Sequence, residues 1–175
     1  MLSQQPRILG PRAPGPMPPP DAATLGKPFS TLSLTHDLTI MLTKPVLELE
    51  DIRRMAQAAE AEARKSGWAV SIAIVDDGGH LLWLQRLDGA APISADIAPA
   101  KARTAAVGRR ESKVYEDMIN QGRMSFLSAP SLSGLLEGGV PVMVDGQCIG
   151  AVGVSGVKSS EDAQIARAGI AALIG

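Results

Sequence analysis

Apolar and small residues alternate along residues 68–75, where every second position from Val70 to Ile74 is branched and apolar. This period of two is typical of a β-strand. The Asp-Asp-Gly-Gly at 76–79 is a turn signal, because glycine accepts positive φ and aspartate hydrogen-bonds its own backbone. Residues 80–86 return as a second strand with the apolar run Leu81 to Leu84. The pattern predicts a first β-hairpin.

A second hairpin is predicted near the C-terminal end of the chain. Residues 140–144 run into Asp145-Gly146, and residues 147–154 return as an apolar strand. An Asp-Gly pair between apolar runs is a strong hairpin signal. A further short strand is expected near Leu135.

Helical periodicity marks residues 49–65, 95–107, 112–120 and a last helix that begins near Ser160. Pro99 either begins the second helix or kinks it, because proline lacks an amide donor. The first helix carries the inner stripe Ile52, Met55, Ala56, Ala59 and Ala63. The third turns Tyr115, Met118 and Ile119 inward, and the last turns Ala163, Ala166, Ile170, Leu173 and Ile174 inward. The order α-β-β-α-α-β-β-α predicts an α+β fold, in which helices cover a small antiparallel sheet.

Composition separates the first 40 residues from the rest, since eight of the 13 prolines lie in residues 1–28. A segment poor in aliphatic residues cannot offset the entropy of ordering itself. Residues 1–40 are therefore predicted to be a disordered proline-rich tail, or else a mis-assigned start with Met41 as the true first residue. The folded domain is expected over residues 41–175.

Charge and composition argue against several classes of protein. The net charge is −1 and aromatic residues make up 3%, so binding to nucleic acid through charge and stacking is not expected. No apolar run approaches the length of a membrane span or a secretory signal, which favours the cytoplasm. The single Cys148 excludes an intrachain disulfide and is expected to be a small buried apolar residue.

Four polar residues, two at the end of a strand and two within a helix, are candidates for ligand binding. Arg86 and Asp88 follow the second strand, and Lys101 and Thr104 share one face of a helix. Arg86 could clamp a carboxylate with two hydrogen bonds while Lys101 adds a point charge. Alternatively, Arg86 and Asp88 form an ion pair with each other at the surface.

Two further positions carry weaker signals. His80, the single histidine of the core, is either a ligand of haem iron, a proton carrier, or a solvated turn residue. Ser155 and Gly156 could offer backbone amides to an anion at the start of the last helix. The segment has no P-loop or dinucleotide-binding spacing.

Four separated blocks of the core resemble the GlcG/HbpS-like family, whose domain also forms the C-terminal part of PduO-type cobalamin adenosyltransferases. The blocks are VSIAIVDDGGHLLWLQRLDGA, APAKARTAA, LEGGVPVMVDGQCIGAVGVSG and SSEDAQIARAGIAAL. The match runs from about Val46 to Leu173, and the blocks stand in the order that the family has.

The resemblance implies a profilin-like fold, with a five-stranded antiparallel sheet between helices in α/β/α layers. It also implies a homo-oligomer, often an octamer, that binds haem, and the GlcG branch is associated with glycolate use. The family-pattern positions that the resemblance favours for the ligand are Arg86, Asp88, Lys101 and Thr104.

Two functions follow as hypotheses. The first is a cytoplasmic oligomeric protein that binds haem or a related tetrapyrrole, with Arg86 and Lys101 at the propionates and His80 or Thr104 near the iron. The second is a cofactor-independent enzyme for a small carboxylate or hydroxy acid, in which His80 or Asp88 moves a proton. A third, purely structural hypothesis is an oligomer with no required ligand.

Overall fold

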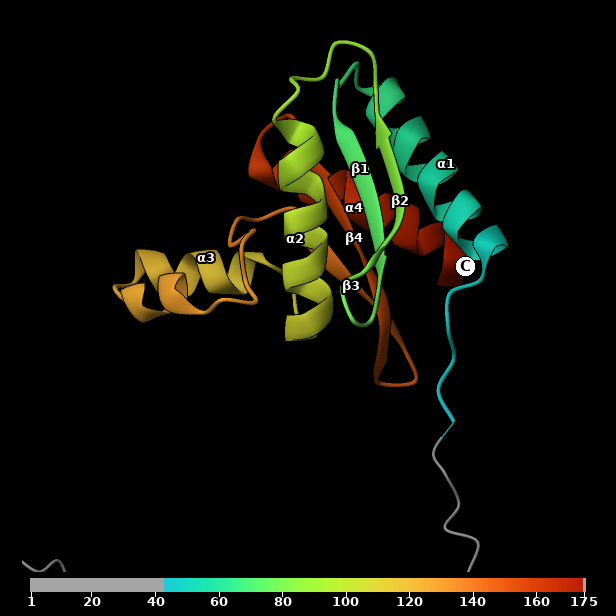
Figure 1. The fold of residues 1–175 in the computed structure, drawn as a ribbon. Coiled ribbons are helices and arrows are strands. Elements are labelled where there is room, and N and C mark those ends of the chain that lie inside the picture. The colour runs from blue at the N-terminus through green and yellow to red at the C-terminus, as the bar shows by residue number, and fades with distance from the viewer. Residues whose placement is uncertain (1–42, 175) are drawn as a thin grey trace, which may run out of the picture. The chain divides into compact units, whose positions relative to one another are not determined.

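The computed structural model describes residues 43–174 (Figure 1), so the predicted tail, residues 1–40, lies outside the described part of the chain. The side chain of Ile174, expected in the inner stripe of the last helix, also lies outside it. The elements in chain order are α1 Leu49–Lys65, β1 Ser71–Asp76, β2 Leu81–Arg86, α2 Ser94–Gly108, α3 Lys113–Asn120, the 3₁₀ helix η2 Met124–Ser128, β3 Gly139–Val144, β4 Gln147–Ser155 and α4 Ser159–Ile174.

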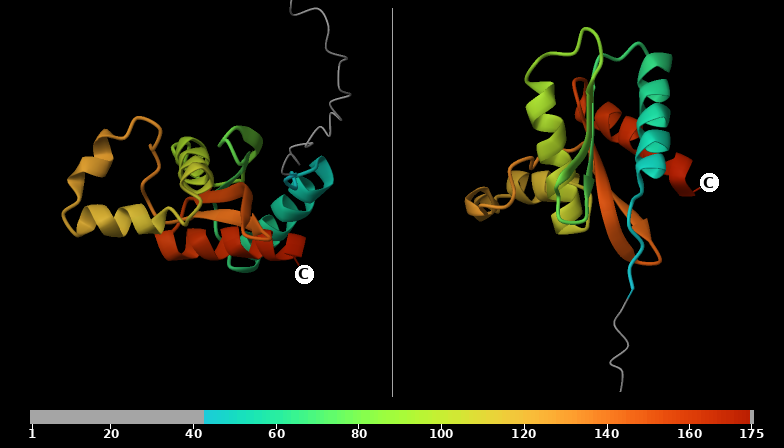
Figure 2. Two further views of the ribbon diagram at one scale, coloured as in Figure 1. Left: turned by 90° about the horizontal axis from the view of Figure 1, so that it is seen from below. Right: turned by 45° about the vertical axis from the view of Figure 1, so that its right-hand side comes forward.

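The strands form one antiparallel sheet in the order β2-β1-β4-β3. Helices α1 and α4 pack together on one face of the sheet and α2 covers the other, as Figure 2 shows. The predicted α+β class, both hairpins and the four helices are therefore confirmed.

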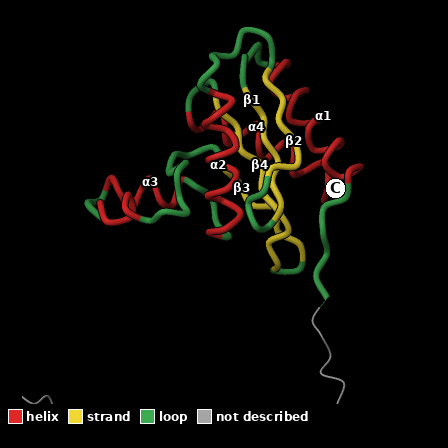
Figure 3. The backbone as a smooth tube through the Cα atoms, viewed as in Figure 1, coloured by secondary structure: helices red, strands yellow, loops and turns green. Residues whose placement is uncertain are grey.

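The expected fifth strand is wrong for the described residues, where the sheet has four strands. The chain around Leu135, just before β3, is loop (Figure 3). Its backbone groups bond to side chains instead of to a neighbouring strand. The amide of Glu137 donates to Glu116 Oε2 at 2.5 Å, and the carbonyl of Leu136 accepts from Ser112 Oγ at 2.5 Å. These bonds take groups that a strand ladder would need.

Both faces of β1 are buried, because the strand lies inside the sheet and helices cover both sides. Ile72 and Ile74 lie in the core beneath α1 and α4, and Ala73 and Val75 lie beneath α2. The predicted alternation therefore assigned the faces correctly. It did not show that the second face, made of small residues, is also buried.

The predicted inner stripe of α1 is confirmed, since all five of its residues are buried. Pro99 lies inside α2 and does not begin it, because the helix starts at Ser94. In α3, Tyr115 is buried as expected, whereas Met118 and Ile119 are only half-buried. A short helix at the side of the sheet has less core to cover it than α1 has.

A buried ion pair joins α2 to α4 at the end of the sheet where β3 begins. Lys101 Nζ lies 2.8 Å from Asp162 Oδ2 and donates to the carbonyl of Val154 at 3.1 Å, and both side chains are at most 3% exposed. Gly138 allows this contact, because a Cβ there would collide with Lys101 Nζ and its φ is +122°. Burial raises the pKa of Asp162, although Lys101 and the amide of Val157 stabilise its charged form.

Removing one member of this pair should be more damaging than removing both. We expect Lys101→Met to lower the free energy of unfolding by about 3–5 kcal/mol, since it leaves Asp162 buried without its counter-charge. The double variant Lys101→Met/Asp162→Leu should recover most of that loss. Urea unfolding of the two single variants and the double variant measures the coupling. Additive losses in the double variant would show that the two side chains are not coupled.

Candidate functional site

One end of the sheet gathers four of the candidate residues, and we call Arg86, Asp88, Ser155 and Gly156 the arginine end. Ser71 pairs with Arg86 on one side and with Ser155 on the other. Directly paired residues share a face, so Arg86 and Ser155 point to the α2 side, about 10 Å apart across two strand spacings. Ser71 Oγ also lies 2.8 Å from Ser94 Oγ, which brings the first residue of α2 to the same end.

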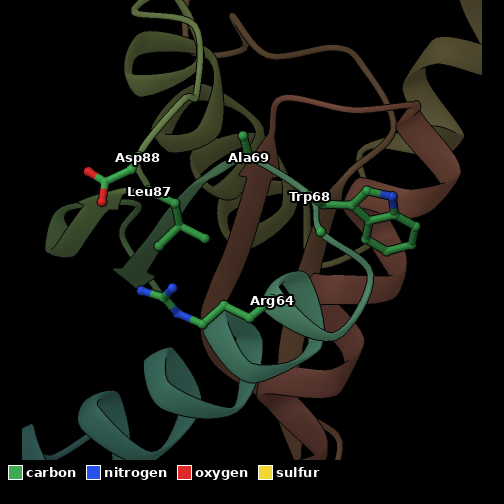
Figure 4. Close-up of a pocket in the computed structure, with 6 residues that line it drawn as sticks. Arg64, Trp68, Ala69, Leu87 and Asp88 are labelled. Carbon is green, nitrogen blue, oxygen red and sulfur yellow. The ribbon is translucent and has the colours of Figure 1, made fainter.

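A shallow cleft of about 240 Å³ opens beside the arginine end, between the end of α1 and the end of β2 (Figure 4). Arg64 and Asp88 lie on one side of it with Leu87 between them, and the ring of Trp68 extends to the other side. Arg64 is paired with Glu60 at 2.6 Å. Among residues 43–174, Asp88 has no ion-pair partner, so the alternative of a surface pair between Arg86 and Asp88 is not formed there.

Sequence reasoning did not select Arg64, Trp68 or Leu87 for this cleft. Arg64 has the pattern of a basic residue in the last turn of a helix, and Trp68 that of a strand residue. They line one cleft because the end of α1 lies beside the end of β2. The spacing of residues along the chain does not show that these two ends are neighbours.

Lys101 and Thr104 lie on one side of α2, as expected, but both are buried. The counter-charge that Lys101 was expected to find in a ligand carboxylate is supplied by Asp162 of the same chain. Thr104 is fully buried, and its Oγ1 has no hydrogen-bond partner in the described part of the chain. Neither residue therefore joins Arg86 at an open surface of this chain.

His80 lies at the opposite end of β2, in the turn after β1. Its backbone amide donates to Asp76 Oδ1 at 2.8 Å, and its Nδ1 lies 3.1 Å from Asp76 Oδ2. Burial disfavours the charge on Asp76, but the bonds from His80 outweigh it and hold the pKa of Asp76 below its ordinary value. The six steps of strand from His80 to Arg86 span roughly 20 Å. Within one chain, the candidate iron ligand His80 therefore lies far from the candidate carboxylate clamp Arg86.

Other chemistry is sparse in the described residues. Cys148 is buried as expected, and burial raises the pKa of its thiol, which disfavours the reactive thiolate. Within residues 43–174 there is no group of three or more His, Cys, Asp or Glu side chains placed to hold a metal ion. None of the helices in that range has the length and apolar character needed to cross a bilayer.

The chain is similar to known proteins along most of its described part. A family model described as "Haem degrading protein HbpS-like" matches residues 47–171. Protein GlcG of Escherichia coli is 58% identical over 115 residues, which cover 66% of this chain and 85% of that protein.

Two solved structures share the fold. A double mutant of HbpS from Streptomyces reticuli is 35% identical, with a TM-score of 0.70, and the match covers 76% of this chain and 90% of that one. The structure of a PduOC:heme complex is 27% identical, with a TM-score of 0.67, over 73% of this chain and 95% of that one.

Thr104 offers a test of the unpaired hydroxyl. A buried hydroxyl without a partner costs about 1–3 kcal/mol, so Thr104→Val, which keeps the shape, should raise the free energy of unfolding by about 1 kcal/mol. Thr104→Ser keeps the hydroxyl but removes a methyl group, and it should lose about 1 kcal/mol. Urea unfolding compares the two. A less stable valine variant would show that the hydroxyl has a partner.

The lowered pKa of Asp76 sets the sign of a pH effect. A carboxyl group whose pKa is lower in the folded state stabilises the fold above its unfolded pKa, and this contribution is lost as pH falls through the folded value. We therefore expect the wild type to lose more stability between pH 6 and pH 3 than Asp76→Asn does. Urea unfolding across this pH range measures the difference. Asp145→Asn, in the turn of the other hairpin, is the control and should follow the wild type.

Proposed function

We propose, for a chain that belongs to the HbpS-like family, that it is a homo-oligomeric protein that binds haem or a related tetrapyrrole. Its similarity to the structure of the PduOC:heme complex supports this proposal. The observation that carries it is the pair of open groups at the two ends of β2. His80 offers an exposed imidazole, and Arg86 offers an exposed guanidinium.

The surroundings of His80 suit an iron ligand. When the ring is neutral, Nδ1–H donates to the carboxylate of Asp76, so Nε2 keeps its lone pair free. The side chain is 77% exposed, which leaves Nε2 accessible. A carboxylate behind a metal-binding imidazole fixes the ring and makes it more basic.

Arg86 suits a propionate group of the tetrapyrrole. Its guanidinium has no hydrogen bond within residues 43–174 and lies at an open end of the sheet. Guanidinium and carboxylate groups bind through two parallel charge-assisted hydrogen bonds. A bound haem would supply the redox chemistry of its iron, and the chain would supply binding and orientation.

Two clefts of the described chain favour a site that is shared between subunits, because the larger one, about 360 Å³ beside α3, is lined by neither His80 nor Arg86. Pockets for small organic ligands usually measure about 300–1,000 Å³, whereas the cleft beside Asp88 measures about 240 Å³. A tetrapyrrole is too large for a cleft of this size, and His80 and Arg86 are far apart in one chain. Assembly of several copies would bring such groups together.

The rival proposal, a cofactor-independent enzyme acting on a small acid, has less support. The small cleft beside Asp88 suits such a substrate. However, Lys101 is paired with Asp162, and His80 lies at the other end of the sheet. Asp88 alone remains near Arg86 as a carrier of a proton.

Several finer expectations stay predictions: the profilin-like topology, an octamer, a place in the cytoplasm and a link to glycolate use. The ligand roles of Asp88, Lys101, Thr104, Ser155 and Gly156 also stay predictions. Haem binding is tested most directly at His80 and Arg86, because their side chains are exposed.

Titration of the purified full-length protein with hemin tests the proposal. We expect a saturable shift of the Soret band at micromolar haem. Arg86→Ala should weaken binding about tenfold or more, because a hydrogen bond to a charged group contributes about 1.5–3 kcal/mol. His80→Ala should change the position of the Soret band, which reports on the iron ligand.

Matched variants control for the loss of a charge or of a ring. Arg53→Ala removes an exposed arginine from α1, and His36→Ala removes the other histidine of the chain. Both should bind hemin as the wild type does. If the wild type shows no saturable shift at micromolar haem, the proposed function is wrong.

A further inference from the structure

Strand β2 forms an edge of the sheet, and its outer side is apolar. Within the described residues β1 is its one partner strand, so the outward amides and carbonyls of β2 have no strand to bind. Leu81, Leu82 and Leu84 are 52%, 40% and 43% exposed. An exposed apolar edge of this kind attracts another strand, and natural proteins cover or blunt it. The ladder of β2 with β1 is interrupted by a bulge at Leu82 and is regular from Trp83 to Arg86.

The opposite edge of the sheet, β3, is different. Met143 is its one large apolar residue exposed to a comparable degree, at 37%. The carbonyl of Gly139 accepts a hydrogen bond from the amide of Ser112, and Pro141 lacks a donor. The apolar, unpaired edge is therefore specific to β2.

We propose that β2 pairs antiparallel with β2 of a second copy of this chain, about a two-fold axis that passes beside Leu84. This inference rests on the proposed function and assigns the second copy as part of the same ligand site. A two-fold axis perpendicular to the sheet keeps each face continuous across the pair, so one residue must lie opposite its own copy. Leu84 fits that position because it is exposed and lies within the regular part of the ladder, Trp83 to Arg86.

The pairing brings His80 of one chain toward Arg86 of the other, although the two residues are far apart within one chain. Because the strands run in opposite directions, the start of one β2 lies beside the end of the other. With Leu84 at the centre, the start of β2 and His80 lie near the partner's Arg86 and the partner's Asp88. The bulge at Leu82 shifts the register there by one residue. The two-fold axis creates this combination twice, so each dimer holds two shared sites.

The charges at the two ends of β2 are complementary in this arrangement. Arg86 and Asp88 have no ion-pair partner among the described residues of their own chain. At the other end, Asp76 carries a carboxylate whose side chain is 37% exposed, next to His80. Antiparallel pairing thus sets an unpaired arginine near an acidic turn, and an unpaired aspartate near a histidine. A parallel pairing would place like ends together.

Cysteine cross-linking tests the register. Residues opposite each other in an antiparallel pair have Cα atoms about 4.5–5.5 Å apart, which lies within the range that a disulfide spans. In a Cys148→Ser background, Leu84→Cys should form a disulfide-linked dimer under mild oxidation. Met143→Cys, on the other edge, should remain mostly monomeric on a denaturing gel. Equal cross-linking of the two variants, or none with Leu84→Cys, would overturn the proposal.

Complementation between two defective variants tests the shared site. Arg86→Ala is expected to weaken hemin binding and His80→Ala to lose the wild-type Soret band, so neither variant alone forms the wild-type site. In a mixed dimer one of the two sites carries both changes and the other carries neither. Co-expression at equal levels should therefore restore about a quarter of the wild-type sites, as expected for random two-fold pairing. If the site lay within one chain, mixing would restore none, and that result would overturn the shared site.

Light scattering after size exclusion separates failure of the interface from failure of the proposed function. Leu84→Lys should lower the oligomeric mass and weaken hemin binding at least tenfold, while Met143→Lys should change neither. A wild type that is monomeric, or a monomeric Leu84→Lys variant that binds hemin normally, would overturn the inference and leave haem binding intact. If the Leu84→Cys variant cross-links but the wild type binds no hemin, the interface is supported and the proposed function is refuted.

Discussion

The close approach of α2 to the sheet is the constraint on which the rest of the structure depends. A Cβ at Gly153 would collide with the carbonyl of Ala98 and with Ala102, and a Cβ at Gly139 would collide with the backbone of Lys101. Glycine on the strands and alanine on the helix therefore let the two backbones lie almost in contact. The helix is then near enough to the sheet for Lys101 to reach round the end of β3 to Asp162. The large aliphatic core lies on the other face, beneath α1 and α4.

This arrangement explains why some polar residues are buried and paired while others are exposed. A lysine on the inner side of α2 is buried and needs an internal counter-charge, because an unpaired charge in the interior is very costly. The exposed groups are those on the edge strand, where no helix covers them. His80 and Arg86 remain open for that reason, and the length of β2 keeps them apart within one chain.

Much of the fold could be predicted from the sequence, since its signals are local. The stripe of α1, the turn at Asp145-Gly146 and the alternation of β1 each depend on residues within one element. The prediction of a fifth strand near Leu135 was wrong because the backbone there bonds to the side chains of Ser112 and Glu116. These two residues lie about twenty positions earlier in the chain. Local pattern does not record which distant side chain will satisfy a backbone group.

The sequence by itself determined the elements, their order and the polar residues that could carry chemistry. The tertiary structure decided which of those residues are available. Lys101 and Thr104 look like surface ligands in a helical pattern but are buried, because α2 packs on the sheet through that side. Ser155 and Arg86 lie near each other because both pair with Ser71. The physical reason is that availability depends on burial and on partners from other elements, and both arise only when the helices and strands pack together.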